Sequence, residues 1–353
     1  CAAEHRCASM HAAFPYATEG CMAMMPASFQ VETGMLKLLN LLKDGRFHSG
    51  QDLGLALGVS RAAVWKQLQH LESEFGVTVH KVRGRGYQLA SALTLLDPDV
   101  IQQHSEPGAW PVSVHEALDS TNAQALRDLA AGARAPFLVL AERQSAGRGR
   151  RGRQWVSPFA ENVYYSLVLR IEGGMRQLEG LSLVVGLAVM HVLREEGIVN
   201  AGLKWPNDVL VAERKIAGIL LELVGDPADV CHVVIGIGIN VNMQENDSVT
   251  QQWTSVRNET GRHVDRNVLV ARLNRRLHSE LQRHAAQGFA AFKDAWEQAN
   301  LWQGRAVSLI AGIQTINGTV LGVDDQGGLR LKVDGVEKSF SGGELSLRLQ
   351  HDT

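Results

Sequence analysis

The sequence predicts a multidomain α+β protein with three parts in order. These are an N-terminal winged helix-turn-helix, a central α/β domain with a mixed sheet, and a small C-terminal SH3-like β-barrel. Three patterns predict this: apolar helical runs followed by a hairpin in residues 34–92, alternating strands and helices in 93–302, and only short strands in 303–353. A chain of 353 residues has room for two or three domains of about 150 residues each.

The composition is that of an ordinary globular protein with nearly balanced charge. The formal net charge is −2, so any contact with nucleic acid must come from a local basic patch. No apolar run approaches the roughly 20 residues that span a bilayer. We therefore expect no membrane partner.

The cysteines are concentrated at the N-terminus. Cys1, Cys7 and Cys21 precede position 22, and Cys231 stands alone. Their spacing fits neither a zinc site nor a disulfide framework, which indicates reduced thiols in a cytoplasmic protein. Residues 1–33 also lack the features of a signal peptide. We expect a disordered extension or an over-long translated start, with the true start at one of three methionines (Met24, Met25, Met35).

Residues 34–92 have the pattern of a DNA-binding unit. An apolar run at 35–42 predicts a first helix, Ser49 can cap a second, and Ser60 can cap a third that ends near Phe75. The third helix places apolar residues at helical spacing toward the core, namely Val64, Leu68, Leu71 and Phe75. The residues left near its start are those with which a recognition helix meets base edges: Ser60, Arg61, Ala62, Trp65, Lys66 and Gln69.

A hairpin with a basic tip follows this third helix. Residues 77–82 and 87–89 are the expected strands, and the tip carries Arg83 and Arg85. A hairpin in this position makes a winged helix, whose wing can hold phosphate. A helical protein-interaction module stays open as an alternative, although the basic wing and the outward cations favour nucleic acid.

The central and C-terminal parts differ in their periodicity. Strands are expected at 137–141, 163–170, 203–204, 209–211, 216–224 and 232–241, with helices at 120–131, 178–196 and 265–287. This mixture indicates an α/β domain with a central sheet. After Trp302 the helices stop, and short alternating strands at 307–310, 318–323, 329–333 and 336–340 predict a small β-barrel.

The run 147–153 places four arginines on a glycine-spaced backbone, and Trp155 follows it. Glycine lets main-chain N–H groups approach a ligand, and arginine presents planar charged forks, so the run suits an oxygen-rich anion such as a phosphate or an acyl-phosphate. The letters also fit G-x-G-x-x-G, but a dinucleotide turn opens a helix, and residues 154–158 offer none. For this run alone, a solvated basic loop stays open.

Four further segments carry polar groups or glycines at positions that suit a ligand. Residues 120–122 (Ser-Thr-Asn) begin a helix, where they can cap it or bind a polar head. Residues 204–208 place a lysine at a strand end beside a turn. Residues 214–218 begin a strand that contains a small glycine, and residues 236–240 put glycines on one strand face, which costs packing unless something fills the space.

Taken in order, the arginine run and the segments 204–208, 214–218 and 236–240 resemble the biotin–protein ligases, in particular the bifunctional bacterial type with a DNA-binding repressor domain. The resemblance covers roughly residues 34–350. It implies an enzyme that joins biotin to ATP, giving biotinyl-5′-adenylate and pyrophosphate. The enzyme then transfers biotin to a lysine of the biotin carboxyl carrier protein of acetyl-CoA carboxylase.

The resemblance also implies the site residues. The biotin and adenylate pocket would be formed by Ser120, Thr121, Asn122, Gln144, Gly147, Arg148, Gly149, Arg150, Lys204 and Gly218. Among these, Lys204, Arg148 and Arg150 would be catalytic: the lysine would stabilise charge on the reacting carboxylate and α-phosphate, and the arginines would hold the loop over the adenylate. Nucleotide neighbours would be Trp155, Asn207, Asp208, Arg214, Lys215 and Asn240. Cys231 is expected to pack rather than react.

The same resemblance implies substrates and partners. No cofactor would be permanently bound and no metal held by protein groups alone, since Mg²⁺ would accompany ATP. Partners would be the carrier protein, operator DNA and, when adenylate is bound, a second copy in a dimer that represses biotin synthesis genes. Two alternatives remain: a lipoate–protein ligase, which shares the catalytic fold, and a ligand-sensing repressor without catalysis. The arginine run and the DNA-binding part favour biotin over lipoate, and the three catalytic cations argue against a pure sensor.

Overall fold

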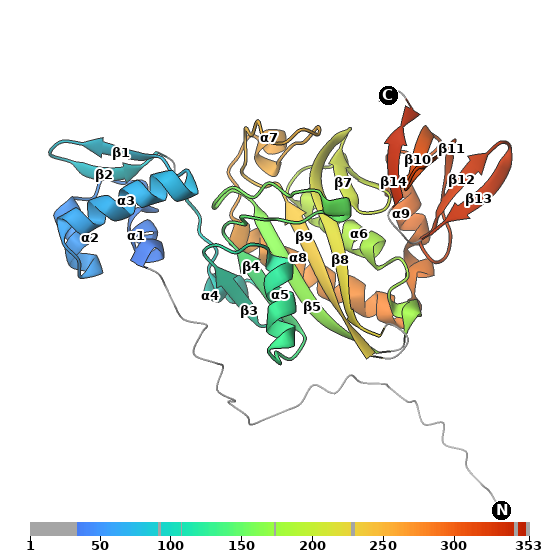
Figure 1. The fold of residues 1–353 in the computed structure, drawn as a ribbon, viewed down its shortest axis with the longest axis horizontal. Coiled ribbons are helices and arrows are strands. Elements are labelled where there is room, and N and C mark those ends of the chain that lie inside the picture. Colours follow the sequence, from blue (N-terminus) through green and yellow to red (C-terminus); the bar gives the residue numbers. More distant parts are fainter. Residues whose placement is uncertain are drawn as a thin grey trace, which may run out of the picture. The chain divides into compact units, whose positions relative to one another are not determined.

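The structure is a computed structural model that describes residues 34–90, 93–106, 108–172, 174–226, 230–341 and 345–350 (Figure 1). The extension expected at 1–33, with three of the cysteines, lies outside these ranges. Within them, no helix combines the length and the apolar character needed to cross a membrane.

The N-terminal part is a helix-turn-helix followed by a hairpin, as the sequence predicts. Its elements are α1 (Gly34–Leu42), α2 (Gly50–Leu57), α3 (Arg61–Phe75), β1 (Val79–Val82) and β2 (Gly86–Leu89). Ser49 Oγ accepts from the Asp52 N–H at 3.0 Å and Ser60 Oγ from the Ala63 N–H at 3.2 Å, so both predicted caps form. Gly58 makes the turn between α2 and α3 with φ 66°, a conformation that glycine adopts without strain.

A seven-stranded mixed sheet forms the centre of the protein, in the order β3-β4-β5-β9-β8-β7-β6. The strands are β3 (Val112–His115), β4 (Phe137–Ala141), β5 (Val163–Glu172), β6 (Ala201–Lys204), β7 (Asp208–Val211), β8 (Arg214–Gly225) and β9 (Val230–Ile239). Only the pairing of β3 with β4 is parallel. Each strand expected between 137 and 241 is present. Cys231 lies inside β9, whereas the sequence pattern placed it just before that strand.

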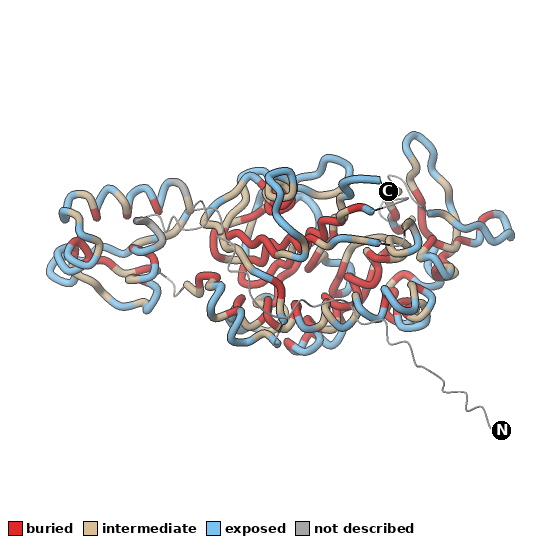
Figure 2. The backbone as a smooth tube through the Cα atoms, turned by 90° about the horizontal axis from the view of Figure 1, so that it is seen from below, coloured by how far each residue is buried: buried red, intermediate tan, exposed pale blue. Residues whose placement is uncertain are grey.

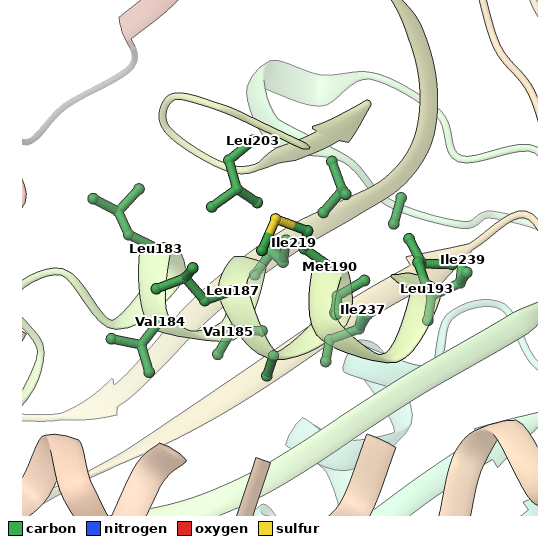
Figure 3. Packing of buried hydrophobic residues seen from close by; sticks show 14 of the residues in the cluster. Leu183, Val184, Val185, Leu187, Met190, Leu193, Leu203, Ile219, Ile237 and Ile239 are labelled. Carbon is green, nitrogen blue, oxygen red and sulfur yellow. The ribbon is translucent and has the colours of Figure 1, made fainter. Parts of the chain in front are cut away.

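Helices cover both faces of this sheet. On one face α5 (Thr121–Ala130) buries Ala125 against Val139, Val168 and Val234. On the other face α6 (Leu181–Glu195) is apolar on nearly all sides, because it lies between the sheet and α8 (Arg266–Gln287). Figure 3 shows its leucines and Met190 against Ile219, Ile237 and Ile239. Three short helices were not predicted, namely α4 (Pro98–Gln103), α7 (Val256–Thr260) and α9 (Lys293–Ala299).

The C-terminal part is a small antiparallel β-domain with strand order β13-β12-β11-β10-β14. Its strands are β10 (Ala306–Ala311), β11 (Gln314–Val323), β12 (Leu329–Val333), β13 (Val336–Phe340) and β14 (Leu345–Leu349), of which only β14 was not predicted. Along β12 buried residues alternate with more exposed ones, whereas three consecutive residues of β10 are buried; Figure 2 colours the backbone by this burial. The domain is joined to the central one by the Trp205 indole, whose Nε1–H donates to the Gly327 carbonyl at 3.0 Å.

Candidate active site

A pocket on the α5 face of the central sheet brings together most of the residues that the sequence singled out. The start of α5, the arginine loop, the turn between β6 and β7, and the strands β5, β8 and β9 all contribute to it. Its lining is formed by Ser120, Thr121, Asn122, Gln144, Arg148, Gly149, Arg150, Trp155, Tyr164, Tyr165, Asn207, Lys215, Gly218, Ile219, Leu220, Gly236, Ile237 and Gly238.

The floor of the pocket is made by glycines on β9. In the strand register, Gly236 lies between Ser166 of β5 and Leu220 of β8, and Gly238 lies between Tyr164 and Gly218. A Cβ atom at Gly236 would stand 2.4 Å from Asn122 Oδ1, and one at Gly238 would stand 2.4 Å from Trp155 Cε2. The space that the two glycines leave is therefore filled by the side chains of Asn122 and Trp155, which offsets the packing cost that glycines bring to a strand.

One end of the pocket is a buried hydrogen-bonded network. The Thr121 N–H and hydroxyl both donate to Gln144 Oε1, at 2.9 and 3.2 Å, and Gln144 Nε2 donates to Ser157 Oγ at 2.9 Å. Ser166 Oγ lies 2.8 Å from Thr121 Oγ1 and 2.5 Å from Asn122 Oδ1. The Ser120 side chain makes no capping bond to α5. Buried donors and acceptors held in this way suit the polar, uncharged head of a ligand.

The arginine loop closes on itself and over the pocket. The Trp155 N–H donates to the Gly147 carbonyl at 2.9 Å, and the Gly149 N–H donates to the Arg153 carbonyl at 2.7 Å. Arg150 Nη1 donates to Asn207 Oδ1 at 3.2 Å, which ties the loop to the β6–β7 turn. Of the four arginines, Arg148 and Arg150 line the pocket, whereas Arg151 and Arg153 lie outside the lining; all but Arg150 are exposed.

A mostly buried carboxylate, 16% exposed, lies between two lysines beside the pocket. Asp208 Oδ1 lies 2.6 Å from Lys215 Nζ, and Asp208 Oδ2 lies 3.6 Å from Lys204 Nζ. Burial acts to raise the pKa of Asp208, but the charges of Lys215 and then Lys204 outweigh it and lower this pKa, so the group is a carboxylate. Burial lowers the pKa of Lys204, against the opposing effect of Asp208.

The two lysines face different surroundings. Lys215 lines the pocket, and its Nζ lies 5.3 Å from the centre of the Trp155 ring. Lys204 is outside the lining, and its Nζ lies 4.6 Å from the centre of the Trp302 ring. Trp302 comes shortly before β10, the first strand of the C-terminal domain. Lys215 is therefore the lysine of this pair that lines the pocket, whereas Lys204, which the sequence pattern singled out, lies on the other side of Asp208.

Several predicted site residues are placed outside the lining. Arg214 forms an ion pair with Glu259 at 2.9 Å, and Asn240 donates to the Thr254 carbonyl at 3.0 Å, so both hold neighbouring loops. Gly147 lies against the Trp155 carbonyl, where a Cβ would stand at 2.4 Å. Among the described residues, no group of three or more His, Cys, Asp or Glu side chains could hold a metal ion.

Two polar residues that matter to the pocket were not singled out from the sequence. Ser166 is fully buried at the floor, and Glu222 accepts from both Asn122 and Arg148 at the rim. Each is a polar residue within an otherwise apolar strand segment, 163–169 and 219–224 respectively. That interruption is the sequence feature that could have identified them.

The N-terminal part presents the surface expected for nucleic acid. Arg61, Ala62, Trp65, Lys66 and Gln69 are exposed on α3, opposite the buried residues of that helix, and the Ser60 hydroxyl caps it. At the hairpin tip Arg83 and Arg85 are both exposed. The guanidinium carbon of Arg85 lies 4.2 Å from the centre of the Phe47 ring, so its position is supported by stacking.

Comparison with known proteins agrees with this arrangement. Residues 114–240 match the biotin/lipoate A/B protein ligase family, residues 35–88 match a helix-turn-helix domain, and residues 304–348 match the biotin protein ligase C-terminal domain. The fold also resembles the biotin protein ligase of Aquifex aeolicus in complex with biotin and ATP. That match has a TM-score of 0.61 and 31% identity, and covers 68% of this chain and 99% of that one.

A ligase catalytic domain joined to a helix-turn-helix defines the class, and the chain belongs to the biotin protein ligase family. Its relatives include the bifunctional ligase/repressor BirA of Salmonella typhimurium, which is 44% identical over 89% of this chain and 97% of the relative. The bifunctional ligase/repressor BirA of Bacillus subtilis is 34% identical over 84% of this chain and 92% of the relative.

Proposed function

We propose that this protein is an ATP-dependent biotin–[acetyl-CoA-carboxylase] ligase of the cytoplasm, and a repressor that uses biotinyl-5′-adenylate as corepressor. The domain limits that accompany the proposal are 34–92 for DNA binding, 93–302 for catalysis and 303–353 for the C-terminal domain. The observation that carries it is one pocket with a buried hydrogen-bonded end, an apolar and glycine-lined floor, and cations at its rim.

In this proposal, different residues of the pocket have different roles in the reaction. Ser120, Thr121 and Gln144 would bind the ureido head of biotin, and Leu220 would contact its apolar part. The biotin carboxylate would then attack the α-phosphate of ATP, with pyrophosphate leaving and Mg²⁺ accompanying the nucleotide. Arg148, Arg150 and the lysine pair Lys204 and Lys215 would stabilise the negative charge that develops there. In the second step the carrier lysine attacks the acyl carbon and AMP leaves.

Biotin-dependent exchange between ATP and pyrophosphate tests the first step. The mass of the carrier domain tests the second, since transfer should add one biotinyl group to a single lysine. Transfer of lipoate in place of biotin would identify a lipoate–protein ligase. Binding of biotin without any exchange would identify a sensor that has lost catalysis.

Loss of Arg150 is expected to release the intermediate. The Arg150→Gly variant loses the bond to Asn207 that ties the loop to the β6–β7 turn. Biotinyl-adenylate should then leave before the carrier docks, and the mixed anhydride should acylate lysines of bystander proteins. Stopped-flow measurement of adenylate dissociation checks this. The Arg151→Gly variant is the control, because that arginine is exposed and outside the pocket lining; equal dissociation from both variants and the unaltered protein would contradict the expectation.

For repression, we infer a dimer on an inverted repeat. A single winged helix contacts only a short half-site, so useful affinity needs two copies. An adenylate that favours the dimer must bind the dimer more tightly than the monomer. Operator binding should therefore require biotin with ATP. Added unbiotinylated carrier should weaken it, because the carrier would compete for the surface of the catalytic domain through which two copies pair. Equal affinity with and without adenylate would leave a ligase without a biotin switch.

Substitutions in the DNA-binding part should separate phosphate contacts from base contacts. Arg83→Ala at the wing should lower the slope of log affinity against log salt by about 0.9. Arg61→Ala on α3 should cost about 1–3 kcal/mol, mainly at one base position. Gel-shift titrations at several salt concentrations measure both effects. Lys338→Ala, at an exposed position of the C-terminal domain, is the control and should change neither.

Cys231 should be dispensable for catalysis. Its side chain is buried in β9, between residues of β5 and β8, so its role is packing. Ligation by the Cys231→Ser variant should stay close to that of the unaltered protein. Complete loss of exchange activity in a variant with an unchanged circular dichroism spectrum would overturn this view.

A further inference from the structure

Glu222 is a carboxylate at the rim of the pocket that no step of the reaction uses. It lies on β8, on the same strand face as Gly218 and Leu220, since alternate residues of a strand share a face. A single oxygen, Oε2, accepts from Arg148 Nη2 at 3.0 Å and from Asn122 Nδ2 at 2.7 Å. The side chain is 26% exposed, so the pair with Arg148 is partly shielded from water.

These two bonds join the arginine loop to the helix at the polar end of the pocket. Asn122 belongs to α5, and its Oδ1 lies 2.5 Å from the buried Ser166 of β5. Arg148 belongs to the glycine-spaced loop, and among the described residues Glu222 is the side chain with which it forms an ion pair. Glu222 therefore links the loop directly to the helix and strand that hold the polar end of the pocket.

We propose that Glu222 is a positioning residue of this enzyme, which holds Arg148 over the pocket before ligand arrives. Without the carboxylate, the Arg148 side chain, which is already 40% exposed, loses its anchor on the sheet and moves into solvent. The loop then keeps its own backbone bonds and the contact of Arg150 with Asn207. A preordered loop lowers the conformational entropy that ligand binding must otherwise remove.

The test uses Glu222→Gln, which keeps size and hydrogen-bonding atoms but removes the charge. The adenylate dissociation rate and the KM for biotin should rise about two- to five-fold, the range that a partly exposed ion pair supports, with kcat changed less. In an Arg148→Gln background the same substitution should add nothing, because Glu222 acts through Arg148. Glu172→Gln, which removes a carboxylate paired with Arg170 on β5 of the same sheet, is the matched control.

The inference rests on the proposed ligase function, so a second readout is independent of activity. In the protein without substrates, Glu222→Gln should speed hydrogen exchange of the Gly149 and Trp155 amides, which the loop's own bonds protect. Unchanged hydrogen exchange of these two amides, or an equal kinetic effect of the substitution with and without Arg148, would overturn the role of Glu222. Absence of biotin-dependent exchange in the unaltered protein would instead contradict the proposed function, and the amide measurement would still decide on Glu222.

Discussion

Replacing Lys215 by methionine is expected to lower biotin-dependent ATP–pyrophosphate exchange by about ten- to a hundred-fold, the kinetic equivalent of one lost charged hydrogen bond. The reason is its place in the pocket: its ammonium group lines the cavity and is held by Asp208 at 2.6 Å. In the proposed reaction, charge would develop between the carboxylate and the α-phosphate within reach of this group. Methionine retains most of the side chain's bulk, so packing against Trp155 should survive.

Lys204 provides the comparison. It lies on the far side of Asp208 and over the Trp302 ring, so Lys204→Met should lower exchange less than Lys215→Met does. Both variants should be checked for unchanged thermal unfolding, because each substitution alters the surroundings of a buried carboxylate. Near-normal exchange by the Lys215 variant, or a larger loss in the Lys204 variant, would reverse the assignment.

The second large effect is expected on stability. Arg266 and Glu142 form an ion pair at 2.6 Å, and their side chains are 0% and 1% exposed. The guanidinium also donates to the carbonyls of Asn162 and Thr94. Because Arg266→Met leaves the Glu142 carboxylate buried without its counter-charge, it should lower the free energy of unfolding by about 3–5 kcal/mol.

Urea unfolding followed by circular dichroism measures this loss. Arg276→Met is the matched control on the same helix, since its pair with Glu195 is exposed and should contribute less than about 1 kcal/mol. Joint replacement of Arg266 and Glu142 by Met and Leu should recover part of the stability, because no unpaired charge remains. A loss below that of the control would show that water or rearrangement compensates the buried carboxylate.

The elements that the sequence predicted are those with a long, clear period. α6 and α8 repeat apolar residues over four turns or more, and β5 and β9 are long strands that are apolar over most of their length. The missed elements are short. β3 has four half-buried residues and forms because it can pair with β4, which is information carried by the rest of the sheet.

The candidate site shows the same limit at the level of single residues. The loop arginines and the start of α5 could be found because their motifs are local. The choice between Lys204 and Lys215 could not, since they lie beside two successive turns, both contact Asp208, and only their three-dimensional positions relative to the pocket distinguish them. Ser166 and Glu222 act through partners more than 40 positions away along the chain, and a single sequence does not show such pairs.

Gly236 and Gly238, the two glycines of β9 at the floor of the pocket, are positions at which two different parts of the pocket can be changed independently. A methyl group added at Gly236 would push on Asn122, beside the polar end, whereas one added at Gly238 would push on Trp155, which belongs to the loop. An alanine at the first position would therefore reshape the recognition of the ligand head, and an alanine at the second would alter how the loop seats over it. The polar end of the pocket and the seating of the loop can thus be altered separately, with every charged group of the site left in place.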